Sequence, residues 1–173
     1  MAEDALDRYL VAHPEAFPPN SIEAEESLLG SVLLWASAAP DKEGNELSGL
    51  PDLFEWLLPQ AFYRDRHVFI YEAMVRLHRR GDRPHRVAVA YELAYGAAAG
   101  VLEACGGADY LSWLISVCPT WLYAASYADI VQTAYERRLR FAAGAASKGK
   151  RREERIEEMK PTRPKTVLDG YER

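Results

Sequence analysis

The sequence contains little cysteine and no long hydrophobic run. Its two cysteines, Cys105 and Cys118, form no C-x-x-C pair and are too few for a disulfide scaffold. No apolar stretch approaches the ~20 residues that a membrane-spanning helix needs. The first ten residues are acidic and lack the apolar block of a signal peptide. We therefore expect a soluble, cytoplasmic protein with reduced thiols and no membrane partner.

Catalytic motifs are also absent. The sequence has no G-x-S-x-G nucleophile elbow, no H-E-x-x-H metal pair and no cysteine with a histidine partner in its sequence context. Residues 144–150 match the G-x-x-x-x-G-K pattern of phosphate-binding loops. However, Arg151 follows where such a loop needs Ser or Thr, and a predicted helix precedes it where the loop needs a strand. We therefore predict no catalytic, cofactor-binding or metal-binding residue on this chain, and no ATP or magnesium site.

The charge is divided unevenly along the 173 residues. Residues 1–136 hold 9 Lys and Arg against 20 Asp and Glu, a net charge of -11, whereas residues 137–173 hold 12 against 6, a net charge of +6. An acidic body argues against a domain that itself grips duplex DNA, because most affinity for nucleic acid comes from cations on phosphates. The basic tail could still contact nucleic acid. The glutamates between its basic residues make it at least equally consistent with a linker. Its residues would be Lys148, Lys150, Arg151, Arg152 and Arg155.

Residues 18–34 combine a helix start with an apolar face. Asn20 can serve as the N-cap, with Glu23 three residues later as in a capping box. Glu25 lies in an acidic first turn, where the helix dipole favours anions. Gly30 costs ~1 kcal/mol relative to alanine, which suggests that another helix passes close to the backbone there. Apolar residues recur at steps of three and four: Ile22, Leu28, Leu29, Val32, Leu33 and Ala36.

Helical spacing continues through most of the chain. Residues 64–80 predict a second long helix, which ends at Gly81, and shorter helices are expected near residues 87–93 and 110–115. His67 has no second ligand residue at metal-binding spacing, so we expect it to be packed and hydrogen-bonded. Residues 53–58 form a short apolar element that we expect to supply core residues: Phe54, Trp56 and Leu57.

The helix that begins near Trp121 and runs into the 140s carries more apolar positions than a small bundle needs for its own core. A short break at residues 117–120 joins it to the preceding helix, and the two would form an antiparallel hairpin. One stripe can pack on the chain's own domain, and we expect the remainder to meet a second copy. The predicted oligomer interface is Tyr123, Tyr127, Ile130, Val131 and Ala134.

Four sequence blocks stand in a fixed order. They are P-P-N-S-I-E-A-E-E-S-L-L-G-S-V-L-L at residues 18–34, F-Y-R-D-R-H-V-F-I-Y-E-A-M at 62–74, G-G-A-D-Y-L at 106–111 and Y-A-D-I-V at 127–131. With these blocks, residues 18–141 resemble the N-terminal domain of DnaB-type replicative DNA helicases. Where that family commonly has an acidic residue after G-x-P-[VI], this chain has His85 and Arg86 after a proline, which weakens the helix cap expected at His85.

The resemblance implies an all-α fold with a compact multi-helix head followed by a helical hairpin. We divide the chain into a mobile arm at residues 1–17, the helical domain at 18–145 and a basic, flexible linker or tail at 146–173. The resemblance also implies a non-catalytic module of DNA replication that forms dimers, builds the ring collar of the primosome and docks primase or a helicase loader. ATP hydrolysis would belong to a separate RecA-like motor domain, for which this sequence leaves no room.

Two other functions stay open. The chain could be the N-terminal half of a split or truncated ATP-dependent DNA helicase, or it could be a nucleic-acid-binding adaptor that uses its basic tail.

Overall fold

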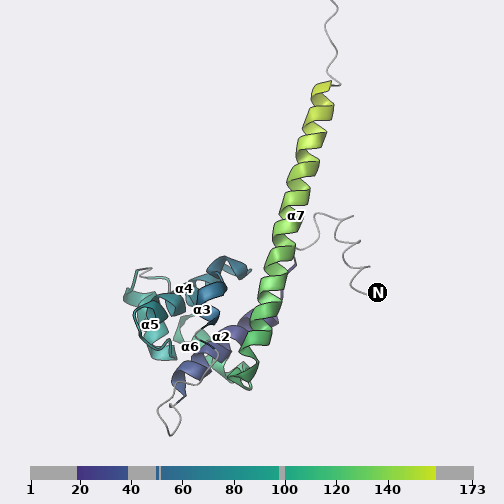
Figure 1. The fold of residues 1–173 in the computed structure, drawn as a ribbon. Helices are drawn as coiled ribbons and strands as arrows, with labels where there is room; N and C mark the ends of the chain where they lie inside the picture. The colour runs from purple at the N-terminus through teal and green to yellow at the C-terminus, as the bar shows by residue number, and fades with distance from the viewer. Residues whose placement is uncertain (1–18, 39–49, 51, 98–99, 159–173) are drawn as a thin grey trace, which may run out of the picture. The chain divides into compact units, whose positions relative to one another are not determined.

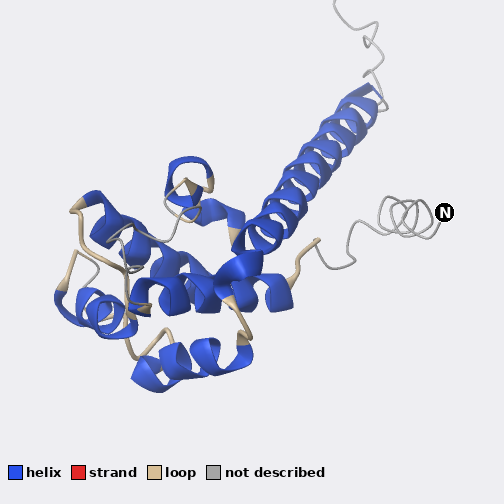
Figure 2. Ribbon diagram, turned by 60° about the horizontal axis from the view of Figure 1, so that its bottom comes forward, coloured by secondary structure: helices blue, strands red, loops and turns tan. Residues whose placement is uncertain are grey.

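The computed structural model of the protein describes residues 19–38, 50, 52–97 and 100–158, and every regular element among them is helical (Figure 2). The predicted all-α class is therefore confirmed. In chain order (Figure 1), the elements are α2 (Ile22–Ser37), α3 (Leu53–Trp56), η1 (Pro59–Ala61), α4 (Asp65–Arg79), α5 (Arg86–Tyr95), α6 (Gly107–Val117), η2 (Trp121–Tyr123) and α7 (Ala124–Glu158).

Contacts between residues divide the chain into two units. The unit Phe17–Leu139 is called the head below, and the other unit combines Met1–Ala16 with Arg140–Arg173. All contacts described in the following paragraphs lie within the head. The predicted arm at residues 1–17 lies outside the described residues. The predicted boundary at residue 145 falls inside α7 and stays a prediction.

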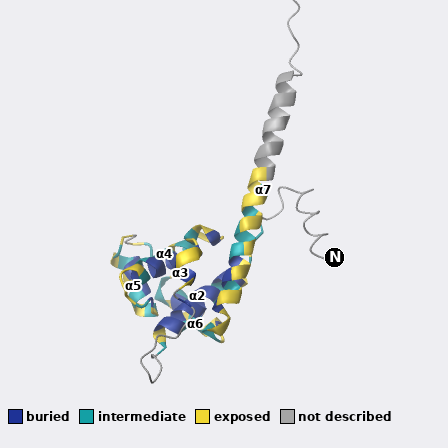
Figure 3. Ribbon diagram, in the orientation of Figure 1, coloured by how far each residue is buried: buried dark blue, intermediate teal, exposed yellow. Residues whose placement is uncertain are grey.

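α2 is the central helix of the head. It packs against α6, η2 and α4, and its residues are buried on nearly all sides rather than on the single face that the spacing predicts (Figure 3). The close approach suggested by Gly30 is confirmed. A Cβ added to Gly30 would lie 2.7 Å from the Cβ of Cys118 and closer still to the carbonyl oxygen of Leu114. Glycine is therefore what allows α6 to cross the backbone of α2.

The start of α2 differs from the prediction by one residue. Ser21, not Asn20, is the N-cap, and its Oγ accepts a hydrogen bond from the backbone N–H of Ala24 at 3.4 Å. Glu23 then stands two residues after the cap, so the predicted capping box does not form. Serine caps a helix as well as asparagine does, and the spacing of the apolar residues alone did not distinguish the two.

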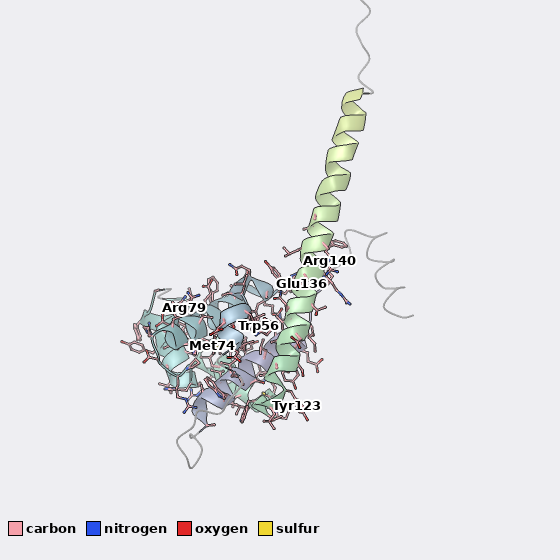
Figure 4. The ribbon with its side chains drawn as sticks, viewed as in Figure 1. Trp56, Met74, Arg79, Tyr123, Glu136 and Arg140 are labelled. Carbon is pink, nitrogen blue, oxygen red and sulfur yellow. The ribbon has the colours of Figure 1, made fainter. Side chains whose placement is uncertain are left out.

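α3 and α4 contribute further residues to the core. Phe54 and Leu57 are buried as predicted, but Trp56, labelled in Figure 4, is exposed because the short α3 turns it away from the core. Tyr71 of α4 is fully buried and donates from its hydroxyl to the carbonyl oxygen of Leu53. The predicted end of α4 is confirmed, because the helix stops at Arg79 and Gly81 adopts a φ of 79°.

α5 begins with a histidine cap, although the resemblance led us to expect a weakened cap there. His85 is the N-cap, and its Nδ1 accepts from the backbone N–H of Ala88 at 3.3 Å. An imidazole nitrogen therefore caps α5, although the sequence predicts a weakened cap at this position. The short helix predicted around residues 87–93 is confirmed.

α6 and the helix that follows it do not lie antiparallel. The chain turns by 86° between Gly107–Val117 and Trp121–Ala143, which is close to a right angle. Cys118 and Pro119 fall in this turn, at the predicted break. Cys118 and Cys105 are both buried and unpaired, as expected for packed thiols.

Candidate interaction surface

The five residues predicted as an oligomer interface separate into exposed and buried positions. Tyr123 and Ile130 are 59% and 46% exposed, and Figure 4 labels Tyr123 beside the start of α7. Tyr127 and Ala134 are half-buried. Val131 is buried in the hydrophobic core of the head, so it stabilises the chain's own fold and is not available to a second chain.

Helix geometry explains this separation. Ile130 lies on α7, and Tyr123 is the last residue of η2, directly before α7 begins. Ala124, Ala128 and Val131 fall on the side that faces the core. The sequence reasoning missed Leu122 and Leu139, which are also exposed. Leu122 directly precedes Tyr123 and extends its surface. We call the exposed side chains Leu122 and Tyr123 of η2 and Ile130 of α7 together the α7 face.

Arg138 holds α7 in one orientation within the head. Its guanidinium donates to the carbonyl oxygens of Pro19, at 3.0 Å, and of Ala61. It also lies 5.7 Å from the ring centre of Tyr63 and 5.6 Å from that of Tyr135. Burial lowers the pKa of Arg138, but a guanidinium remains charged in proteins. The contact fixes the rotation of α7 about its axis and thereby keeps the α7 face outward.

The predicted nucleic-acid contact lies further along α7, which continues as a helix to Glu158. The side chains there are outside what the structure describes, so this contact stays a prediction for Lys148, Lys150, Arg151, Arg152 and Arg155. Residues 144–150 are continuous helix rather than a loop that follows a strand, which confirms the reason for rejecting them as a phosphate-binding loop.

A buried polar network that the sequence reasoning missed joins α2, α4 and α6. The Glu25 carboxylate, fully buried on α2, accepts from the backbone N–H of Tyr63 at 2.7 Å and lies 2.6 Å from Nδ1 of His67. Nε2 of His67 lies 2.8 Å from the hydroxyl of Tyr110. The expectation that His67 is packed and hydrogen-bonded is confirmed. Glu25 precedes Leu28 and Leu29 by three and four residues, and this spacing on the apolar face could have revealed its burial.

The network continues to the surface through Tyr110. Its hydroxyl lies 3.3 Å from Oε1 of Glu26, and the Arg66 guanidinium stacks over its ring at 4.0 Å. Burial, followed by the negative charge of Glu26, raises the pKa of Tyr110, so the group remains a hydroxyl that can donate one proton. Glu26 also lies 3.7 Å from Arg66. The network thus connects three helices through hydrogen bonds and ion pairs. Among the described residues, no group of three or more His, Cys, Asp or Glu side chains could hold a metal ion.

A second buried carboxylate joins α4 to α5. Glu92 accepts from Nε of Arg76 and from Nη2 of Arg80, each at 2.9 Å. Burial by itself would raise the pKa of Glu92, but these hydrogen bonds outweigh it and hold the pKa below its ordinary value. One carboxylate thus holds two guanidinium groups in place beside the surface of α5.

No single helix among the described residues is long and apolar enough to cross a membrane. The bent pair Gly107–Val117 and Trp121–Ala143 reaches such a length and composition only when its two helices are taken together.

Comparison with known proteins identifies the family. Residues 17–133 match the family model of the DnaB-like helicase N terminal domain. The chain is 35% identical over 161 residues to the replicative DNA helicase DnaB of Geobacillus stearothermophilus, and 34% identical over 161 residues to the replicative DNA helicase DnaC of Bacillus subtilis. In both comparisons the match covers 92% of this chain but 32% of the relative, so the chain spans about a third of the length of these relatives.

A solved structure supports the same assignment. The crystal structure of the N-terminal domain of DnaB helicase from Mycobacterium tuberculosis matches with a TM-score of 0.62 and 37% identity, over 75% of this chain and 84% of that one. The helical head built around α2 is thus shared in both sequence and structure. The chain belongs to the DnaB-like helicase N-terminal domain family.

Proposed function

We propose that this chain is a non-catalytic module of DNA replication that associates with itself and docks other replication proteins. Its family membership and its relatives, which are named as replicative DNA helicases, support the setting in DNA replication. Primase, a helicase loader and a helicase motor domain are the partners that this setting suggests. ATP hydrolysis and DNA unwinding would require a motor domain, either joined to this chain or supplied by another one.

The α7 face is the observation that supports self-association. Three large apolar side chains, Leu122, Tyr123 and Ile130, lie on the solvent side of a segment whose other side is packed in the core. A two-fold contact would bury the same residues from both chains. Covering several hundred Å² of apolar surface at ~25 cal/mol per Å² contributes several kcal/mol, which must offset the cost of association. We therefore expect a dimer whose population depends on protein concentration.

The test is a charge placed on the α7 face. Because Ile130 is half exposed in the single chain, Ile130→Glu should leave the fold intact while it disrupts the dimer. Light scattering at increasing concentration should show a monomer for this variant and a dimer for the unchanged protein, with equal helical circular dichroism. Arg79→Glu, an exposed charge change on α4 that Figure 4 shows well away from Tyr123, should leave the dimer intact. A wild-type chain that stays monomeric at high concentration would remove the support for self-association through this face.

A further inference from the structure

The side of α7 that faces the core of the head changes in character along the helix. Its positions follow steps of four and three residues, from Ala124, Ala128 and Val131 to Tyr135 and Arg138. The first three are 2%, 0% and 1% exposed, whereas Tyr135 and Arg138 are half-buried. The last position of this stripe within the head is therefore a guanidinium, where a packed stripe ordinarily has an apolar side chain.

Hydrogen bonds take the place of apolar packing at this last position. The Arg138 guanidinium donates to the carbonyl oxygens of Pro19 and Ala61, which are 119 and 77 residues away in the sequence. It also lies near the rings of Tyr63 and Tyr135. Apolar packing has no preferred direction, whereas a hydrogen bond weakens steeply as its angle departs from linearity. The apolar contacts thus hold α7 close to the head, and the hydrogen bonds of Arg138 fix its direction.

The guanidinium makes these contacts without a carboxylate partner. Among the described residues, none of the ion pairs involves Arg138. Loss of water lowers the pKa of Arg138, and the more distant negative charge of Glu25 acts in the opposite direction. A partly buried cation that has only carbonyl acceptors regains its hydration when it leaves the site. The bound position is therefore opposed by a competing, hydrated one.

We propose that Arg138 and the carbonyl oxygens of Pro19 and Ala61 form a latch that gives α7 a closed and an open arrangement on the head. In the closed arrangement, which the structure shows, the guanidinium binds both carbonyl oxygens and α7 has one direction. In the open arrangement, water hydrates the guanidinium and both carbonyl oxygens. The turn that carries Arg138 then moves away from the head and uncovers Tyr135 and the ring of Tyr63. The latch is a conformational device distinct from self-association.

The test measures the direction of α7 with two spin labels on the full chain, at a concentration at which it is monomeric. The labels are attached at Leu58→Cys, directly before η1, and at Leu139→Cys, directly after Arg138. Both leucines are exposed, whereas Cys105 and Cys118 are buried and protected from the label. Double electron–electron resonance should give one narrow distance distribution for the chain with Arg138.

Arg138→Met keeps the length of the side chain but removes every donor. The population at the original distance, relative to all other distances, should fall about tenfold or more, because a hydrogen bond to a charged group contributes about that factor. Arg138→Lys keeps the charge without the planar fork of donors and should give an intermediate distribution. Arg79→Met, an exposed arginine on α4 that Figure 4 labels, is the matched control and should leave the distribution unchanged.

A second pair of labels, at Leu58→Cys and Tyr123→Cys, spans the head without including α7. Its distance should be the same in every variant, which establishes that the head is intact. An unchanged narrow distribution for the Leu58 and Leu139 pair in Arg138→Met would overturn the proposal. Equal broadening of both pairs, or loss of the helical circular dichroism in both Arg138 variants, would also overturn it, because Arg138 would then be required for the fold rather than for the direction of α7.

Discussion

Replacing Glu25 by alanine removes the acceptor at the centre of the buried network. Two donors lose their partner: the backbone N–H of Tyr63, at 2.7 Å, and the ring nitrogen Nδ1 of His67, at 2.6 Å. His67 is fully buried in the head, so water cannot replace the missing carboxylate without opening the core. The substitution therefore tests whether this single carboxylate holds α2 and α4 together.

The expected loss of stability is large. Each buried donor left without a partner costs about 1–3 kcal/mol, and the shortened side chain also leaves unfilled volume between the helices. We expect a total of about 3–5 kcal/mol. This is a large part of the ~5–15 kcal/mol that stabilises a typical domain. Glu25→Gln keeps the shape and one acceptor oxygen, and should fall between alanine and the unchanged protein.

Urea unfolding followed by far-ultraviolet circular dichroism measures the effect. With a slope of ~1–3 kcal/mol per M, the midpoint for Glu25→Ala should fall by about 2 M at an unchanged slope. Glu23→Ala is the matched control, since it removes an exposed glutamate from the same turn of α2. Glu23→Ala should lower the free energy of unfolding only by the ~0.3–1 kcal/mol that a negative charge contributes near a helix N-terminus. Equal midpoints for the two alanine variants would refute the role assigned to Glu25.

Two further predictions concern α2 and α5. Gly30→Ala gains ~1 kcal/mol of helix propensity, but its Cβ collides with the backbone of Leu114, and such overpacking costs ~1–3 kcal/mol. Thermal unfolding should therefore show a net loss of stability. Ser126→Ala, at an exposed helical position near the start of α7, is the control and should cause no loss. The pKa of Glu92 is held below its ordinary value of 4.5. The ionised carboxylate therefore stabilises the fold above pH 4.5, and this stabilisation is lost as the pH falls through the lower pKa of the folded state. Glu92→Gln should therefore be less stable at neutral pH and lose less stability on acidification; parallel pH profiles of unfolding would contradict this.

The positions of the helices could be predicted because their signals are local. The end of α4 at Gly81, the break at Pro119 and the close approach at Gly30 each depend on a few neighbouring residues and on the conformations that glycine and proline allow. The resemblance to the helicase family depended on four short blocks, which the comparisons bear out over residues 17–133. The choice between Asn20 and Ser21 as the N-cap was not determined, because both residues cap helices equally well.

The sequence by itself therefore determined where the helices lie to within a few residues, and which segments have apolar residues to bury. Only the tertiary structure decided which apolar residues meet. Ile130 and Val131 are adjacent and equally apolar, yet Ile130 is exposed and Val131 lies in the core, because the contacts of Arg138 with distant carbonyl oxygens fix which side of α7 faces the head. The sequence places Glu25 only in an acidic first turn, whereas in the structure it is buried beside His67, 42 residues away. Periodicity is a property of one segment, whereas burial depends on distant segments that pack against it.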